Sequence, residues 1–346
     1  MKQDVTAILI GYGSIGRRHA KTLAGLRSDL IIVDGSQNAR DQASKDHPGS
    51  KVAGNLDELD GRVKDWKSTV AVIASWGPSH SSLFNELADR GVRRILCEKP
   101  MADSIASAHQ MASRAAREGI VLAVHHYVRY ARLVSALARA AADYDLGNPV
   151  KVIVEGGAAC LATNGVHWID FARELFGARP EFVISTARAD NINPRSADLG
   201  FFEGTAVWGF SGGREAVISF TNLSSIALTT RVFYLNALVE MDADLNLSIR
   251  RRDMAAVEQF PKVTRTGPAL QCLFEGQLPG VVQFEDRLRA AVLDVSGAAA
   301  ETCPGSIGVD AVEYCIGAFV SARQRSAVEF PLDREGPLAE ERWPIS

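Results

Sequence analysis

The 346-residue chain lacks an excess of either charge, paired cysteines and long apolar runs. Its 38 Lys and Arg residues against 41 Asp and Glu leave a net charge of -3, so the basic surface that attracts nucleic acids or anionic membranes is absent. Five scattered cysteines, none in a C-x-x-C pair, argue against a disulfide framework and a zinc site. No apolar stretch approaches the roughly 18 residues that cross a bilayer. We therefore expect a cytoplasmic protein with a small-molecule ligand, without nucleic-acid or membrane partners.

What the sequence does have is a glycine-rich loop directly after a short apolar run at 6–10. In a G-x-G-x-x-G loop the first glycine permits a tight turn, the second lets the backbone approach a pyrophosphate, and the third lets the next helix pack on the strand. The helix N-terminus then faces the phosphates. The loop predicted to bind a dinucleotide consists of Gly11, Tyr12, Gly13, Ser14, Ile15 and Gly16.

An acidic residue follows at the expected distance. Asp34 ends a second apolar run, about 20 residues after the glycine loop, where a carboxylate binds the ribose hydroxyls of NAD and repels the 2′-phosphate of NADP. Arg17, Arg18 and Arg40 keep NADP open, but the pattern favours NAD. In the alternative reading the glycines serve only a turn and Asp34 only ends a strand.

Apolar and helical segments alternate up to about residue 124, which predicts a doubly wound parallel sheet of the Rossmann type. The predicted strands are 6–10, 30–33, 70–74, 94–97 and 120–124, and the predicted helices are 15–26, 79–89 and 104–118.

After residue 150 the pattern changes to longer strands with few helices. This predicts a second α/β domain with a large, mostly antiparallel, open-faced sheet, through which a homo-oligomer would form. We expect domains at 1–125 and 126–346, with tail helices that pack back on the first domain or the sheet. The predicted strands are 150–155, 182–187, 205–210, 216–220, 229–235 and 245–250, and the tail helices are 281–293 and 309–323.

Two clusters could carry chemistry. The first is Glu98-Lys99, at the carboxyl end of the predicted strand 94–97, where open parallel sheets bind ligands. An ammonium there can hydrogen-bond a substrate hydroxyl and stabilise negative charge on its oxygen as a hydride leaves. The alternative is a surface lysine that follows a strand.

The second cluster is a predicted helix that begins at an N-cap, Asn164, and ends at Gly177. His167 and Asp170 then lie three residues apart on one face. A histidine held by a carboxylate can take a proton from a carbinol at neutral pH. The alternative is a core or capping histidine.

His125 and His126 are adjacent, so at most one of them can face a cofactor. Neither has an acidic or cysteine partner at ligand spacing in the sequence, and we expect no metal site. Arg129 could pair with a carboxylate or phosphate of the substrate, or bridge the domains.

Taken in order, these motifs resemble the Gfo/Idh/MocA family, which includes glucose-fructose oxidoreductase and inositol dehydrogenase. The resemblance implies an N-terminal Rossmann domain, a C-terminal α/β domain with an open sheet, and NAD(P)-dependent oxidation or reduction of a sugar, cyclitol or nucleotide sugar. The residues that carry it are Gly11 to Gly16 with Arg18-His19, Cys97-Glu98-Lys99-Pro100, Arg129-Tyr130 and Gly165-x-His167-x-x-Asp170.

The resemblance also implies roles for single residues. Lys99 would orient and polarise the reacting hydroxyl, and His167 would accept or donate its proton. Trp76 and His80 would belong to a loop beneath the nicotinamide, and Glu98 would contact the cofactor. The residues expected near the substrate are Asp170, Thr163, Asn164 and Arg129.

One position departs from the family pattern. Many members have Asp four residues before the catalytic histidine, where this chain has Thr163. Either His167 works with Lys99 and Asp170 alone, or the substrate differs. Two further alternatives are an enzyme that recycles its NAD during epimerisation, elimination or glycosidic cleavage, and an NAD-binding sensor without turnover. The Thr-Asn-Gly-x-His-Trp-Ile-Asp form resembles members from surface-polysaccharide pathways, which favours a nucleotide-activated or modified sugar.

Overall fold

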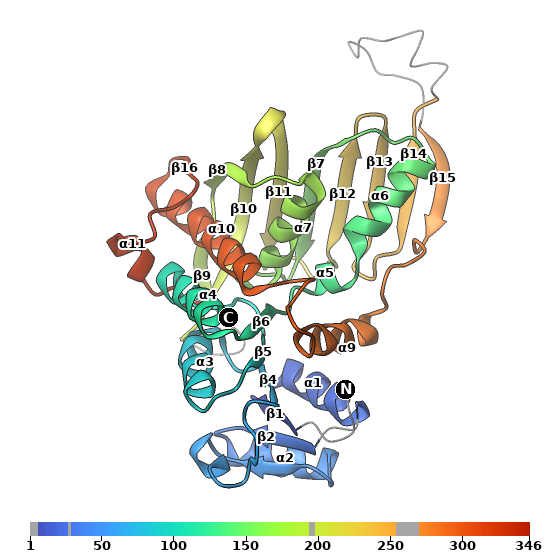
Figure 1. The fold of residues 1–346 in the computed structure, drawn as a ribbon. Helices are drawn as coiled ribbons and strands as arrows, with labels where there is room; N and C mark the ends of the chain where they lie inside the picture. Colours follow the sequence, from blue (N-terminus) through green and yellow to red (C-terminus); the bar gives the residue numbers. More distant parts are fainter. Residues whose placement is uncertain (1–5, 27–28, 194–197, 254–269) are drawn as a thin grey trace. The chain divides into compact units, whose positions relative to one another are not determined.

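The computed structural model describes residues 6–26, 29–193, 198–253 and 270–346 (Figure 1). Within it the chain forms two compact units. Unit 1 comprises Met1–Ala131, Val282–Ile316 and Leu332–Ser346, and unit 2 comprises Arg132–Val281 and Gly317–Pro331. The predicted division at 125 and 126, as a division into functional domains, stays a prediction.

Unit 1 is built on a six-stranded parallel sheet in the order β3-β2-β1-β4-β5-β6. The order reverses between β1 and β4, and open parallel sheets bind ligands at the carboxyl ends of the strands beside such a reversal. The predicted doubly wound sheet is confirmed. Its strands are β1 (Thr6–Ile10), β2 (Asp29–Val33), β3 (Lys51–Ala53), β4 (Val70–Ile73), β5 (Arg94–Cys97) and β6 (Val121–Val124).

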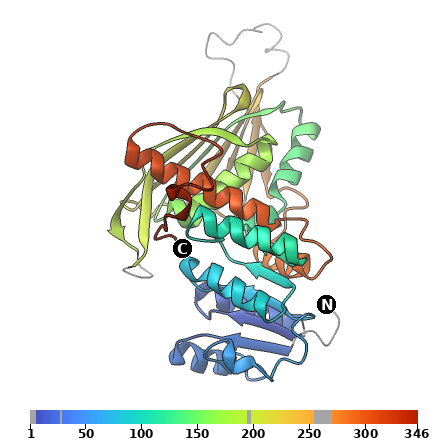
Figure 2. The ribbon, with the colours of Figure 1, turned by 60° about the vertical axis from the view of Figure 1, so that its left-hand side comes forward.

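Helices pack on both faces of this sheet. One set, α1 (Ser14–Gly25) and α2 (Gln37–Asp46), packs on β1, β2 and β3. The other set, α3 (His80–Asp89) and α4 (Ile105–Glu118), packs on β4 and β6, and both come to the front in Figure 2. A helix from much later in the chain, α9 (Phe284–Val295), packs against β5, β6 and α1. Unit 1 therefore takes part of its core from the C-terminal third of the chain.

Within residues 6–124 the predicted helices and strands agree with the structure to within one residue, but helix α2 and strand β3 were missed. The predicted tail helix 281–293 corresponds to α9, which begins three residues later. Helix α2 has the sequence QNARDQASKD and buries only Ala43, so it carries no apolar stripe that would predict a helix. Strand β3 has three residues, one of them buried.

Unit 2 is built on a ten-stranded sheet in which β7 and β11 are the parallel neighbours and every other described pair is antiparallel. This confirms the predicted mostly antiparallel sheet. Its order is β15-β14-β13-β12-β7-β11-β10-β8-β16, with β9 beside β10. The strands are β7 (Pro149–Gly157), β8 (Pro180–Ser185), β9 (Arg188–Ile192), β10 (Gly200–Phe210), β11 (Arg214–Thr221), β12 (Thr229–Tyr234), β13 (Ala237–Met241), β14 (Leu247–Arg251), β15 (Gln271–Gly276) and β16 (Val328–Glu329).

Helices α6 (Leu133–Asp143) and α7 (Val166–Phe176) lie over one face of this sheet (Figure 1). Along β7 the side chains of Val152 and Val154 are buried, whereas the intervening Ile153 is half-buried. This alternation is typical of a sheet with one covered face. The remaining helices are α5 (Tyr127–Tyr130), α10 (Gly305–Gln324) and α11 (Pro337–Glu340).

Among the described residues, none of the helices combines the length and the apolar character needed to span a membrane.

Candidate functional site

The glycine loop of unit 1 has the close approaches that its pattern predicts. Gly11 has a φ of +95°, and a Cβ there would lie 2.7 Å from the carbonyl oxygen of Ala74. A Cβ on Gly16 would lie 2.0 Å from the carbonyl oxygen of Gly11, so only glycine lets α1 begin this close to the loop. Gly13 has no heavy atom within 4 Å of its Cβ position. The loop is therefore tight on the protein side and open at Gly13.

Asp34 follows the end of β2 and accepts a hydrogen bond from this loop. Its Oδ2 accepts a hydrogen bond from the Tyr12 backbone N–H at 2.7 Å, and its Oδ1 accepts one from the Ser36 N–H at 2.8 Å. The carboxylate is half-buried, and each oxygen keeps a lone pair for another donor. Arg40 donates to the backbone carbonyls of Asp34 and Gly35, at 2.6 and 3.0 Å.

These residues fit a dinucleotide. The first turn of α1 has no side-chain cap at its N-cap residue, Gly13, so its backbone N–H groups can bind phosphate oxygens. Asp34 offers a carboxylate to the ribose on the same sheet edge. The side chain of Tyr12 is turned inward: it is 2% exposed, and its hydroxyl donates to Asp46 Oδ2 at 2.9 Å. Tyr12 could therefore contact the ligand through its backbone.

Glu98 and Lys99 lie at the carboxyl end of β5, as predicted. The Glu98 backbone N–H donates to Ile73 at the end of β4, and its side chain is only 4% exposed. Lys99 is half-buried, and its peptide bond to Pro100 is cis. The end of β5 therefore lies beside the end of β4, close to the glycine loop.

His80 connects the loop after β4 with the loop after β5. Its Nδ1 lies 2.9 Å from the Pro100 carbonyl oxygen, and its Nε2 lies 3.1 Å from that of Ser75. Burial lowers the pKa of His80, against the two carbonyl acceptors, which raise it. Trp76, at the start of the same loop, is 47% exposed. The roles of both residues beneath a nicotinamide stay predictions.

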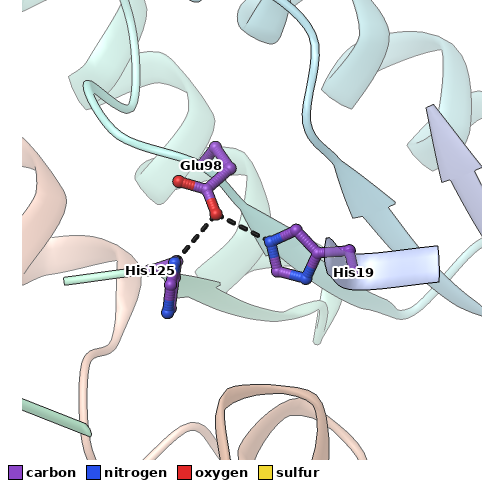
Figure 3. A group of neighbouring side chains, drawn as sticks. All are labelled: His19, Glu98 and His125. Carbon is purple, nitrogen blue, oxygen red and sulfur yellow. Dashed lines mark hydrogen bonds and ion pairs between the residues drawn. The ribbon is translucent and has the colours of Figure 1, made fainter. Parts of the chain in front are cut away.

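The structure also brings together three residues that the sequence did not connect (Figure 3). Glu98 Oε1 lies 2.7 Å from His19 Nε2 and 2.8 Å from His125 Nδ1, and all three side chains are buried. The three ligand-type atoms lie within 4.8 Å of one another. The expectation that His125 has no carboxylate partner was wrong, because that partner comes from a neighbouring strand rather than from nearby sequence. His19 lies four residues from Ile15 and from Leu23, and this position in an apolar stripe was a usable signal of a buried histidine.

In unit 2, the predicted helix exists but begins differently. A single π-helical turn, η3 (Leu161–Gly165), precedes α7. Asn164 lies inside this turn and does not cap the helix: its Oδ1 accepts from the Cys160 N–H at 3.1 Å, while its own N–H donates to the Cys160 carbonyl at 2.7 Å. The N-cap prediction was wrong because this local ring competes with capping. Gly177 ends α7 with a φ of +59°, as predicted.

His167 and Asp170 lie in the first turns of α7, three residues apart, so they share one face of the helix. They are 4% and 1% exposed. Thr163 is half-buried in η3, just before the helix. Arg129 lies in α5 of unit 1 and is half-buried. The catalytic and substrate-binding roles of these residues stay predictions.

A glycine loop between the first strand and helix of a parallel sheet, with a carboxylate after the second strand, defines a dinucleotide-binding Rossmann domain. Residues 5–126 match the sequence model of the Gfo/Idh/MocA family, described as an oxidoreductase family with an NAD-binding Rossmann fold. This match covers the segment that contains the glycine loop, Asp34 and Glu98-Lys99, and it confirms the resemblance seen in those motifs.

The individual proteins that are similar to this chain include dehydrogenases. A D-apiose dehydrogenase of Paraburkholderia graminis is 31% identical over 206 residues, which are 52% of this chain and 52% of that protein. The match thus spans about half the length of that relative. Levoglucosan dehydrogenase, solved in complex with NADH, is similar in fold, with a TM-score of 0.74 and 15% identity over 95% of this chain and 100% of its own. The WlbA dehydrogenase from Bordetella pertussis, solved with NADH and UDP-GlcNAcA, has a TM-score of 0.70 and 18% identity over 95% and 100%.

Proposed function

We propose that this chain is an NAD-dependent oxidoreductase that transfers a hydride between nicotinamide and a CH–OH group of a sugar-like substrate. The observation that carries the proposal is the Asp34 carboxylate, which closes on the open glycine loop of an NAD-binding family fold. Lys99 lies at the same carboxyl edge of the sheet, where it can hydrogen-bond the reacting hydroxyl of the substrate.

We propose NAD rather than NADP as the cofactor. A 2′-phosphate beside Asp34 would meet a negative charge, and Arg40 already donates to two backbone carbonyls. Asp34→Ser should weaken NAD binding roughly tenfold, the effect of losing a charged hydrogen bond, and should improve the relative affinity for NADP. The exposed Asp41→Asn on α2 is the matched control. Equal affinities for NAD and NADP in the unchanged protein would contradict the assignment.

The proposed roles divide the chemistry between two side chains. When bound, the nicotinamide accepts the hydride that leaves the carbinol carbon. The Lys99 ammonium hydrogen-bonds the hydroxyl oxygen and stabilises its developing negative charge. His167 takes the hydroxyl proton, so that a ketone and a protonated imidazole result, and reduction runs in the reverse direction. Because η3 has no acidic residue, Asp170 is the carboxylate on α7 that supports His167.

For the substrate we propose a nucleotide-activated or otherwise modified sugar. The support is the Thr-Asn-Gly-x-His-Trp-Ile-Asp sequence and the ligands with which similar proteins were solved, which include levoglucosan and UDP-GlcNAcA. The test is the absorbance of reduced nicotinamide during incubation with NAD, and separately NADP, and a panel of sugars, cyclitols and nucleotide sugars. Turnover with one class supports the proposal.

Two variants test the site. Lys99→Ala and His167→Ala should each lower turnover about a hundred- to a thousandfold, the size of a lost general base or charge-stabilising group, while both variants still bind NAD. Exposed His109→Ala on α4 is the control. Turnover that survives both changes would contradict the assignment. NAD binding with no turnover on any substrate would instead favour the cofactor-recycling enzyme or the sensor.

We also propose a homo-oligomer formed through the uncovered face of the unit 2 sheet. Ile184, Val207, Val217 and Ile153 stand in one cross-strand row and are half-buried or exposed. A contiguous apolar row on an open face is typical of an interface. Val217→Asp should reduce the molar mass measured by light scattering, whereas Val217→Thr should not. An unchanged mass for both variants would contradict this interface.

A further inference from the structure

Glu98 is a buried carboxylate that receives two hydrogen bonds through one oxygen. Its Oε1 accepts from His19 Nε2 at 2.7 Å and from His125 Nδ1 at 2.8 Å, and no dashed line joins its other oxygen to either ring (Figure 3). An ionised carboxylate can only accept, so each histidine donates its proton at the nitrogen that faces Glu98.

The opposite ring nitrogens of the two histidines are buried as well. His19 Nδ1 and His125 Nε2 are buried and have no hydrogen-bond partner among the described residues. Protonating either histidine would bury an N–H group without an acceptor, which is costly. Burial alone would raise the pKa of Glu98, but the two histidines hold it well below its usual value. The cluster therefore holds Glu98 as an ionised carboxylate, with a histidine N–H donor on either side of its Oε1.

The same nitrogens argue against a metal ion in this cluster. Histidines that bind metals usually donate their second N–H to a carboxylate, a carbonyl or water. Here those nitrogens have no such partner in the described part of the chain. The separations of 2.7 and 2.8 Å are also direct N–H···O distances.

The cluster lies on the half of the sheet that takes the second nucleotide. In a doubly wound fold each half binds one nucleotide across the switch point. Asp34, at the end of β2, marks the half for the adenosine ribose. Glu98 and His125 follow β5 and β6 in the other half, and His19 reaches them from the second turn of α1. If the chain binds NAD as proposed, this half receives the nicotinamide.

We propose that the ionised Glu98, held by His19 and His125, shifts the binding preference of the protein toward oxidised NAD relative to NADH. The oxidised nicotinamide ring is a cation and the reduced ring is neutral, so a fixed negative charge in a buried setting stabilises the oxidised form selectively. Lys99, the next residue in the sequence, adds a positive charge. This charge is present both in the unchanged protein and in the Glu98→Gln variant compared with it below, so it does not affect the comparison.

His19 and His125 are positioning residues in this scheme. The His125 ring stacks on Tyr130 with centroids 5.8 Å apart, and the Tyr130 hydroxyl donates to Asp294 of α9 at 3.0 Å. These two contacts hold the His125 ring in place on the side that faces Tyr130. The carboxylate is thereby held from α1 on one side and from α9, through Tyr130 and His125, on the other.

The experiment is the calorimetric titration of the full chain with NAD and, separately, with NADH. Glu98→Gln removes the charge but keeps the shape and an acceptor. It should shift the ratio of the two dissociation constants roughly tenfold toward NADH, the effect of one charge at a distance on the order of 10 Å and an effective dielectric constant of about 20. Asp29→Asn, an exposed carboxylate at the opposite edge of the same sheet, should leave the ratio unchanged.

Paired variants test the two histidines. His19→Leu and His125→Leu remove a donor and should shift the ratio in the same direction as Glu98→Gln. His19→Gln and His125→Asn can place an amide N–H where Nε2 or Nδ1 stood, and they should restore the original ratio. A purely structural role would change the thermal stability of all these variants without moving the ratio.

The outcomes separate this inference from the proposed function. If the unchanged protein binds neither cofactor, the proposed function fails and this inference with it. If both cofactors bind and Glu98→Gln leaves their ratio unchanged, the function stands and this inference is overturned. A stoichiometric metal ion that stays with the protein until chelation, and whose removal alters the ratio, would also overturn it.

Discussion

At the scale of single residues, the start of α1 has no room for a side chain at Gly16. Gly16 and Gly25 lie on the same helix, but a Cβ on Gly16 would lie 2.0 Å from the Gly11 carbonyl oxygen, whereas the Gly25 position is open. We expect Gly16→Ala to lower the free energy of unfolding by about 2 to 3 kcal/mol, as overpacking does. Gly25→Ala should be neutral or slightly stabilising, because alanine favours helix. Urea unfolding of the two variants measures this, and equal losses would contradict the geometry.

A second residue-scale prediction concerns pH. Burial holds the pKa of His19 below its ordinary 6.5, and His80 behaves in the same way. Below about pH 6.5 the unfolded chain therefore binds protons that the folded chain does not, so stability falls with acidification by up to about 1.4 kcal/mol per pH unit for each histidine. Above that pH both states are neutral and the effect is absent.

The measurement is the free energy of unfolding between pH 7.5 and 5.5, a range that lies above the titration of Glu98 in either state. His19→Gln should reduce the dependence of the unfolding free energy on pH by the contribution of one proton, which is up to about 1.4 kcal/mol per pH unit. The exposed His109→Gln on α4 is the control. If His19→Gln leaves the slope intact, His19 is not the buried neutral group described.

At the scale of elements, the turn before α7 positions the helix that carries His167. Asn164 Oδ1 accepts from the N–H of buried Cys160, so Asn164→Ala leaves a buried donor without a side-chain acceptor. We expect a loss of about 1 to 2 kcal/mol in the free energy of unfolding. Asn164→Asp keeps an acceptor at the same position and should lose less. Equal losses, measured in urea, would show that this bond does not stabilise the turn.

The same element shows what the sequence can and cannot predict. Apolar spacing and Gly177 identified α7 and its end, because both signals are local. The start was misplaced because Asn164 bonds to Cys160 rather than to the helix N–H groups, a choice between two local bonds that spacing does not resolve. His19 and Glu98 lie 79 residues apart in the chain, and they meet only because β1, β4 and β5 are neighbours in the sheet. A strand order of this kind is a tertiary property.

At the scale of the whole molecule, the compact units do not follow the order of the chain. The segment that matches the NAD-binding family, 5–126, is only part of unit 1, which also contains 282–316 and 332–346. Helix α9 covers β5 and β6, and the Cys303 carbonyl accepts from the Val124 N–H at the edge of the sheet. These later segments supply core that the first 131 residues lack.

We therefore expect a fragment of residues 1–131 to unfold without cooperativity, because the apolar surface of β5 and β6 beneath α9 would be open to water. The side chains of α9 that this fragment loses from its core include Leu288, Ala291, Val292 and Val295. Joining 282–316 to the fragment through a flexible linker returns α9 and the strand-like edge at Cys303, and should restore a cooperative transition in circular dichroism. If the fragment of residues 1–131 already unfolds cooperatively and binds NAD as the full chain does, then α9 is an accessory of the Rossmann core and not a part of it.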